Sequence, residues 1–225
     1  MSESLKNLFS KIPKNYDLIN SILTFGFDNI WRKRAAKIAS NLKKNYILDV
    51  CTGTGKQAFY LKKYTKKEVL GVDFCFPMLM KAGKEQKFPV FLANAKFLPF
   101  KDETFDLLTI SFATRNLNTT RDALLNTFKE FRRVLKKEGY FLNLETTQPH
   151  FFLLRFFLHL YSKIFIKPVG RAISGSKEAY AYLSSTIPKF YGAPQLEEIL
   201  KEAGFSEVKF KYLFPYVVAL HISKK

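Results

Sequence analysis

A short apolar run that ends in a glycine-containing loop constrains the fold of this chain more than any other feature. Residues Tyr46–Cys51 predict a strand, Thr52–Gly55 form the loop, and residues 57–64 predict a helix. Glycines at the carboxyl end of a strand allow the backbone to approach a ligand closely. A second predicted strand, Glu68–Asp73, ends in an acid, whose carboxylate can accept hydrogen bonds from both ribose hydroxyls of an adenosine.

The rest of the chain continues to alternate between strands and helices. Strands are predicted over 89–93, 105–112, 140–146, 208–213 and 216–222, and helices over 78–86, 119–137 and 195–203. The run 105–112 is apolar throughout, which is typical of a strand buried on both faces. The helix 119–137 is expected to begin at a cap from Asn118 or Thr119 and to stop before Gly139. We therefore predict an α/β fold with a doubly wound, mostly parallel, seven-stranded sheet that closes in an antiparallel hairpin at Phe214-Pro215.

Length and composition favour a single domain over residues 1–225. The chain is 47% hydrophobic, and no repeat or linker divides it. We expect a cofactor-binding core over 46–149 and a C-terminal helix with a strand pair over 193–225. The segments 1–45 and 150–192 fall outside the alternation, and we expect them to be helical lids that pack together over one edge of the sheet.

The surface is strongly basic, with a formal net charge of +18. Such a surface attracts nucleic acid or anionic lipid without choosing between them. The most hydrophobic stretch, residues 151–166, is interrupted by Arg155, His159 and Lys163, which would form one polar stripe on a helix. It is shorter than the roughly 20 residues of a membrane span. Burial against the core is the favoured interpretation of this helix, and contact with a membrane surface is the alternative.

The loop favours S-adenosylmethionine over a dinucleotide as cofactor. The dinucleotide motif requires a third glycine, whereas Lys56-Gln57-Ala58 follow Gly55, and residues 105–145 contain no second glycine loop. Asp49, at the end of the first strand, and Gly53 belong to the same motif. The two cysteines, Cys51 and Cys75, have no metal-ligand spacing, so we expect reduced thiols and no metal.

Several motifs, in this order, resemble the menaquinone and ubiquinone biosynthesis C-methyltransferases, which methylate demethylmenaquinone and polyprenyl-methoxy-benzoquinol rings. The motifs are Lys14–Asn20, Phe25-Gly26, Trp31-Arg32, Leu48–Gly55, Ala93–Ala95, Leu98–Phe100, Ile110–Leu117, Arg133–Lys136, Tyr180–Leu183 and Val217–His221. The resemblance implies a class I, Rossmann-like methyltransferase that uses S-adenosylmethionine to methylate a ring carbon of a polyprenyl quinol. It also places Thr54, Asp73, Asn94, Ala95 and Ser111 on cofactor-contacting positions.

Three residues depart from the pattern. Cys51 occupies the position of the first glycine in the general methyltransferase loop, and Ala113 replaces a glycine of the family. Lys56 stands where the family usually has an aspartate, which leaves Asp49 to supply a carboxylate to the methionine part of the cofactor.

The resemblance also assigns candidate catalytic residues. Arg115 would hold a phenolate, or a water that takes the phenol proton, and Asn116 would orient a ring oxygen. Tyr16 would bond the second ring oxygen from the N-terminal lid. The reacting ring must be reduced, because a quinone is electrophilic.

Tyr180 and Tyr182 are candidates for lining the substrate pocket, with packing inside the lid as the alternative. Glu145 is a candidate base acting through water. His150 is a weaker candidate, since a lone histidine near a strand end is usually structural.

Other functions stay open at this point. An RNA methyltransferase would explain the basic surface, but Ser111–Thr114 replace the N-P-P-Y-like loop of base N-methylation, so we expect no nucleic-acid partner. Another small-molecule methyltransferase, or a scaffold with a vestigial site, are further alternatives. The first 20 residues lack a signal-peptide pattern, and we expect a cytoplasmic protein that associates peripherally and transiently with anionic membrane surfaces. A homodimer and the identity of the quinol nucleus are left open.

Overall fold

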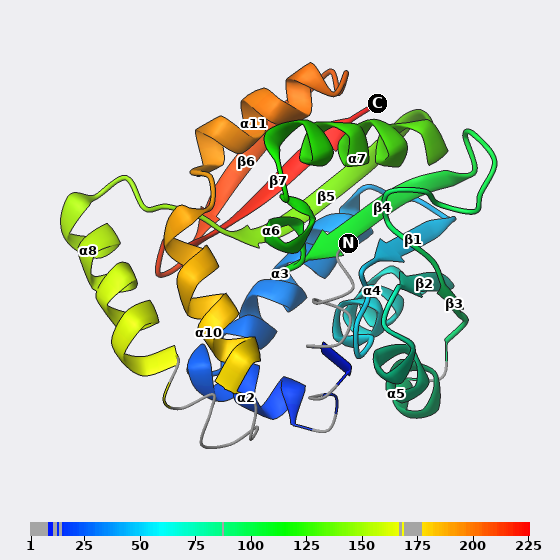
Figure 1. Ribbon diagram of the computed structural model, residues 1–225. Helices are drawn as coiled ribbons and strands as arrows, with labels where there is room; N and C mark the ends of the chain where they lie inside the picture. The colour runs from blue at the N-terminus through cyan, green and yellow to red at the C-terminus, as the bar shows by residue number, and fades with distance from the viewer. Residues whose placement is uncertain (1–8, 11–12, 14, 87, 167, 169–176) are drawn as a thin grey trace.

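The computed structural model describes residues 9–10, 13, 15–86, 88–166, 168 and 177–225. Among these residues, seven strands form one sheet in the order β3-β2-β1-β4-β5-β7-β6 (Figure 1). Strands β1 to β5 run parallel, and β7 is antiparallel to both β5 and β6. The predicted doubly wound α/β sheet with a closing hairpin is therefore confirmed.

The strands are β1 (Ile47–Val50), β2 (Val69–Asp73), β3 (Val90–Leu92), β4 (Phe105–Ser111), β5 (Leu135–Thr146), β6 (Val208–Leu213) and β7 (Val218–Lys224). The helices are α2 (Tyr16–Leu23), α3 (Phe27–Asn41), α4 (Lys56–Thr65), α5 (Phe76–Gln86), α6 (Thr114–Leu117), α7 (Arg121–Val134), α8 (Phe152–Tyr161), η1 (Ser162–Ile166), α10 (Lys177–Thr186), η2 (Ile187–Lys189) and α11 (Ala193–Glu202).

Helices cover both faces of the sheet, which buries the central strands. All four residues of β1 are buried, and five of the seven residues of β4 are buried, as its continuous apolar run predicts. Helices α7 and α11 pack on one face, and α3 and α4 pack on the other. The α7 face contains a cluster of four aromatic rings, Phe128, Phe131, Phe141 and Phe205, with neighbouring centroids 5.5 to 6.2 Å apart.

The predicted helix 119–137 is wrong at both ends. The structural cap is Thr120, whose hydroxyl accepts the backbone N–H of Ala123 at 3.1 Å. The helix stops at Val134, because Leu135 turns extended, pairs with Phe105 of β4 and is fully buried. Gly139 consequently lies in β5 and does not end a helix. A buried strand pairing outweighs the helical pattern of the lysines that follow.

The N-terminal segment 1–45, expected as a lid, divides into two parts. Helix α3 belongs to the layer that covers the sheet, and Trp31 donates its indole N–H to the carbonyl of Phe214 at 2.7 Å. Helix α2 lies instead beside the segment that follows β5. Tyr161 donates its hydroxyl to the carbonyl of Leu23 at 2.7 Å, so the two expected lid segments do contact each other.

Helix α8 contradicts the favoured interpretation that it is buried. None of its residues is buried, and it lies at the left edge of the molecule in Figure 1, away from the sheet. Arg155 and Lys163 of the expected polar stripe are exposed, whereas His159 is half-buried and hydrogen-bonds Gln148 at 2.8 Å. Among the helices that the structure describes, none has the length and apolar character needed to span a bilayer.

The aromatic cluster generates a stability prediction. Phe141→Ala removes a fully buried ring that contacts three others, and we expect it to lower the free energy of unfolding by about 3–5 kcal/mol. Urea denaturation followed by circular dichroism measures this change. Phe97→Ala is the matched control, since Phe97 is 77% exposed, and its effect should stay within about 0.5 kcal/mol. Equal losses in the two variants would contradict the assignment of the core.

Candidate functional site

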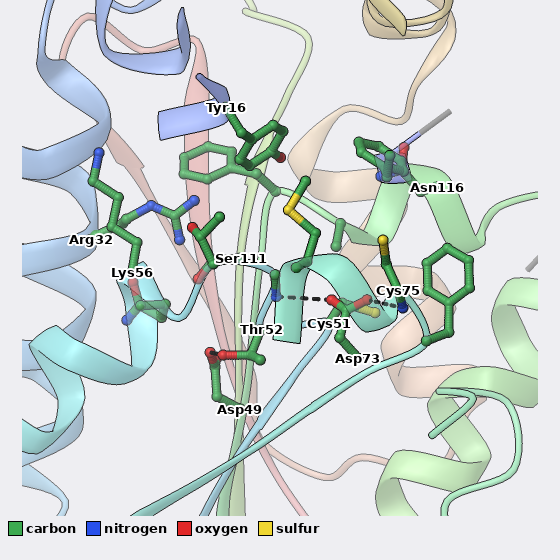
Figure 2. Close-up of a pocket in the computed structure, with 18 residues that line it drawn as sticks. Tyr16, Arg32, Asp49, Cys51, Thr52, Lys56, Asp73, Cys75, Ser111 and Asn116 are labelled. Carbon is green, nitrogen blue, oxygen red and sulfur yellow. Dashed lines mark hydrogen bonds between the residues drawn. The ribbon is translucent and has the colours of Figure 1, made fainter. Parts of the chain in front are cut away.

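A cleft lies where β1, β2 and β4 end, at the carboxyl edge of the sheet. Its volume is about 50 Å³. Figure 2 shows Asp49 and Asp73 at the bottom of the view and Tyr16 at the top. The lining residues are Phe9, Tyr16, Arg32, Asp49, Cys51, Thr52, Gly53, Thr54, Lys56, Gln57, Asp73, Phe74, Cys75, Met78, Ser111, Phe112, Ala113 and Asn116. The cleft therefore unites predicted residues from four separate segments of the chain, around residues 16, 49–54, 73 and 111–116.

The loop after β1 requires backbone conformations that favour glycine. Gly53 has a φ of 56°, and a Cβ on it would meet nothing within 4 Å, so its open side faces the cleft. Gly55 has a φ of 80°, and a Cβ there would lie 2.7 Å from the ring of Phe88. Cys51 has a φ of 54°, the left-handed region. This conformation is one that glycine adopts most easily, which fits the glycine found at this position in the general methyltransferase loop.

Asp73 joins the loop to the end of β2. Its Oδ2 accepts the N–H of Gly53 at 2.8 Å, and its Oδ1 accepts the N–H of Cys75 at 2.9 Å. Burial raises the pKa of the carboxyl to about 6, although these backbone hydrogen bonds oppose the rise. Each oxygen keeps a further lone pair, so the carboxylate can also accept hydroxyl donors from the cleft.

Asp49 is held by two hydroxyl groups. Thr52 donates to its Oδ2 at 2.7 Å, and Thr109 of β4 donates to its Oδ1 at 2.6 Å. Burial raises the pKa of Asp49 to about 6, against the lowering effect of these hydrogen bonds and of Arg32. A buried carboxylate that lacks an ion-pair partner among the described residues is suited to bind a cationic group of a ligand.

Asn94 and Ala95 line a narrow cleft beside Asp73 and Leu117. This second cleft shares Cys51, Asp73 and Phe74 with the first one. The side-chain Oδ1 of Asn94 accepts the backbone N–H of Lys96 at 3.1 Å. A local turn therefore holds the side chain of Asn94, which lines the same narrow cleft as Asp73.

Two ion pairs connect the loop and α5 to the N-terminal helices. Thr54 donates to Asp17 of α2 at 2.8 Å, and Lys81 of α5 lies 3.3 Å from the same carboxylate. Lys56 lies 2.6 Å from the buried carboxylate of Asp28 on α3. The lysine that replaces an aspartate of the family thus pairs within the protein instead of presenting a carboxylate to the cleft.

A larger, mainly apolar cavity of about 320 Å³ adjoins the cleft. It is lined by Tyr16, Asn20, Leu23, Thr24, Phe25, Phe27, Asp28, Trp31, Arg32, Phe112, Arg115, Thr146, Leu154, Phe157, Leu158, Tyr161, Ile166, Ile187, Pro215, Val217 and Val218. Three residues, Tyr16, Arg32 and Phe112, line both spaces. A ligand in the cavity would therefore reach the cofactor cleft at these three side chains.

Arg115 lies on the wall of the apolar cavity, and its buried Nε–H donor is free. Its Nη1 bonds Thr146 at 2.9 Å and lies 3.5 Å from Glu145, whereas its Nε has no hydrogen-bond partner. Glu145 also accepts the backbone N–H groups of Arg115 and Thr146. Glu145 lines neither space, so the geometry makes it a support for Arg115 and not a base that touches the ligand.

Of the remaining candidates for catalysis or substrate binding that the structure describes, only Asn116 is among the residues that line either space. Asn116 lines the cofactor cleft, is absent from the wall of the apolar cavity, and has an unpartnered Oδ1. Tyr182 is half-buried, lines neither space and packs against the apolar cluster between α2 and the segment after β5, which is the lid alternative. Burial raises its pKa. The side chain of Tyr180 falls outside the described residues. His150 is exposed and packs edge-on against Tyr212, away from both spaces.

Arg32 is the site residue to which sequence reasoning gave no role. It is buried and lines both spaces, and its Cζ lies 5.0 Å from the ring centroid of Phe112. The Trp31-Arg32 motif was visible in the sequence, but only as part of a resemblance. Its position depends on how α3 packs against the sheet, which no local pattern reveals.

The chemistry of the residues that line the cleft suits the expected S-adenosylmethionine. Paired acids lie at the carboxyl ends of β1 and β2, Gly53 leaves room for close approach, and the unpartnered atoms Arg32 Nε and Asn116 Oδ1 belong to residues that line the cleft. Among the described residues, no group of three or more His, Cys, Asp or Glu side chains could hold a metal ion.

Comparison with known proteins gives consistent matches. The model of the ubiE/COQ5 methyltransferase family matches residues 1–225. The chain is 39% identical over 220 residues to the demethylmenaquinone methyltransferase of Thermotoga maritima, covering 96% of this chain and 93% of the relative. It is 36% identical over 236 residues to the ubiquinone/menaquinone biosynthesis C-methyltransferase UbiE of Rickettsia bellii, covering 99% of this chain and 93% of the relative.

Solved structures support the fold. A SAM-dependent methyltransferase from Archaeoglobus fulgidus superposes with a TM-score of 0.66 at 18% identity, covering 93% of this chain and 99% of the other. A SAM-dependent methyltransferase from Aquifex aeolicus superposes with a TM-score of 0.58 at 18% identity, covering 84% of this chain and 88% of the other.

The buried carboxyl groups generate a prediction about pH. The pKa of Asp49 rises from 3.8 to about 6 on folding, so its stabilising contribution is complete below 3.8 and is lost as the pH rises through about 6. Asp49→Asn keeps the shape and the hydroxyl partners but carries no charge. We expect its stability relative to the wild type to improve by roughly 2 kcal/mol from about pH 4.5 to about pH 7.5, measured by urea denaturation.

Asp106→Asn is the control, because the pKa of Asp106 is lowered. Burial acts to raise it, but hydrogen bonds from Tyr46 and Lys136 prevail. The Asp106 carboxylate stabilises the fold above pH 3.8, and this stabilisation is lost only at lower pH. The difference in stability between Asp106→Asn and the wild type should therefore stay constant from about pH 4.5 to about pH 7.5. A constant difference for Asp49→Asn as well would contradict the buried charge.

Proposed function

Because the chain belongs to the ubiE/COQ5 methyltransferase family, we propose that it methylates a ring carbon of a polyprenylated quinol in menaquinone or ubiquinone biosynthesis. The names of its relatives supply the two quinol classes, demethylmenaquinol and the ubiquinone precursor. The observation that carries the proposal is the junction between the polar cleft and the apolar cavity at Tyr16, Arg32 and Phe112. A polar cofactor and an apolar substrate would meet at that junction.

The cofactor would be held by the edge of the sheet. Asp73 would accept the ribose hydroxyls, Asn94 and Ala95 would contact the adenine, and Gly53 would allow the backbone to come close. Thr54, Gly55 and Ser111 complete the expected set, in the loop and at the end of β4. When bound, S-adenosylmethionine supplies an electrophilic methyl group.

The chain's own contribution to the chemistry is to make the quinol ring nucleophilic and to exclude water. A reduced ring becomes carbanion-like beside an oxygen that loses its proton to water. The ring carbon would then form the new C–CH3 bond as the S–CH3 bond breaks and S-adenosylhomocysteine leaves, and the displaced ring proton would pass to water, which restores the aromatic quinol. The free Nε–H of buried Arg115 supports hydrogen bonding to that phenolate in a low-dielectric cavity. Burial raises the pKa of Tyr16, which therefore stays protonated at neutral pH and can donate to the other ring oxygen. Asn116, on the cofactor side, supports orientation of the reacting groups.

The test is transfer of labelled methyl to quinol. Purified protein is incubated with methyl-labelled S-adenosylmethionine and reduced demethylmenaquinol or the benzoquinol, with bulk RNA in a parallel tube. We expect label in the quinol. Arg115→Ala should lower the rate by about 10²–10³-fold, because one buried donor to the phenolate is lost.

Controls separate chemistry from folding. Arg115→Lys keeps a cation beside Glu145 but loses the planar fork, so it should fold and still be at least about tenfold slow. Arg121→Ala removes an exposed arginine paired with Glu202 and should leave the rate unchanged. Label only in RNA would reject the proposal in favour of an RNA methyltransferase. Cofactor binding without label in either tube would indicate another small-molecule substrate.

We further propose that α8 lies in the interface of an anionic membrane, from which the quinol enters. Its residues Leu154, Phe157 and Leu158 line the apolar cavity, and the rings of Phe152, Phe156 and Phe157 are each more than half exposed. The cavity therefore continues outward into an apolar surface. Arg155 and Lys163 flank that surface, and the +18 charge complements anionic lipid.

Vesicle sedimentation tests this docking. The protein should bind vesicles that contain phosphatidylglycerol, and Phe156→Glu should weaken binding by about tenfold or more. Phe97→Glu adds the same charge at an exposed ring outside α8 and should change binding much less. Equal effects of the two changes would contradict the docking. A dimer that Phe156→Glu dissociates, seen by analytical ultracentrifugation, would assign this face to a second copy instead.

A further inference from the structure

Arg32 is a buried cation that has no ion-pair partner among the described residues. Its side chain is 9% exposed, and its Nε has no hydrogen-bond partner. No hydrogen bond or ion pair joins it to another described residue. Its contact with Phe112 is a cation–π interaction at 5.0 Å. Because a guanidinium stays charged and is costly to bury unpaired, this position is suited to an anionic ligand group.

The other cations around the two spaces already have carboxylate partners. Lys56 pairs with Asp28 at 2.6 Å, Lys81 with Asp17 at 3.3 Å, and Arg115 with Glu145 at 3.5 Å. Among the described cations around the two spaces, Arg32 alone lacks an acidic partner. Figure 2 draws Arg32 at the same side of the cleft as Lys56 and Ser111.

The charge that faces Arg32 in the cleft is the carboxylate of Asp49. Both residues line the same small space, and the positive charge of Arg32 is among the influences that lower the pKa of Asp49. Yet no ion pair joins them. A guanidinium and a carboxylate that share a cleft without contact complement an α-amino acid, which carries an ammonium and a carboxylate on one carbon.

We infer that Arg32 binds the α-carboxylate of the methionine part of S-adenosylmethionine, while Asp49 faces the α-ammonium group. The inference rests on the proposed cofactor and adds the residue that recognises its amino-acid end. It also accounts for Lys56, since a lysine paired with Asp28 leaves the recognition of the carboxylate to Arg32. The residue would tie α3 of the N-terminal segment to the bound cofactor.

Isothermal titration calorimetry with two ligands tests the inference without any quinol. S-Adenosylmethionine carries the α-carboxylate, and decarboxylated S-adenosylmethionine lacks it but keeps the amine. The wild type should prefer the intact cofactor by about ten- to a hundredfold. Arg32→Met should lose this preference by weakening only the intact cofactor, and Arg32→Lys should retain part of it. Arg34→Gln, on the exposed side of the same helix, should leave it unchanged.

The outcomes separate this inference from the proposed function. A preference that survives in folded Arg32→Met, as judged by circular dichroism, would overturn the inference. If that variant keeps the preference but methylates quinol slowly, Arg32 serves the substrate instead. If Arg32→Met does not fold, Arg32→Lys takes its place as the test. A full preference for intact S-adenosylmethionine in Arg32→Lys would overturn the inference. If Lys56→Gln then loses that preference, the carboxylate site lies at Lys56. A wild type that binds neither ligand would reject the proposed cofactor together with the inference.

Discussion

The two carboxylates buried at the carboxyl edge of the sheet, Asp49 and Asp73, are the groups around which the rest of the site is arranged. Asp73 accepts the N–H groups of Gly53 and Cys75, so one side chain fixes both the glycine loop and the turn after β2. Asp49 is held by hydroxyl groups of the loop and of β4. Burying these acids costs free energy, which the raised pKa values express. Hydroxyl and cationic groups of a bound ligand would offset that cost.

The N-terminal helices turn this edge into a closed site. The contacts of Thr54 with Asp17 and of Lys56 with Asp28 join the loop to α2 and α3. These helices also form part of the wall of the apolar cavity, so the same contacts place a polar and an apolar space side by side. The outer wall is α8, whose exposed rings fit the proposed lipid contact. The polar cofactor and the apolar substrate that we propose would each match one of these two spaces in polarity.

Local sequence patterns predicted correctly those elements whose structure depends on neighbouring residues alone. The strand Tyr46–Cys51, the glycine loop and the acid at Asp73 were visible because periodicity and turn chemistry act over short distances. The end of α7 was missed because Leu135 pairs with Phe105, a contact between residues distant in sequence. The exposure of α8 was missed because an apolar helix has the same pattern in a core and on a docking surface. The position of Arg32 in the site could not be predicted from the sequence, because its burial depends on the packing of α3.

The sequence by itself determined the sheet, the cofactor loop and the family to which the chain belongs, because these depend on the order of residues along the backbone. It also placed Arg115 and Asn116 just after β4. Only the tertiary structure decided which space each side chain faces. Arg115 lines the apolar cavity, Asn116 lines the cleft, and Glu145 lies behind Arg115. That assignment required the packing of α2, α3 and α8 against the sheet edge, since a cavity is a property of several segments together.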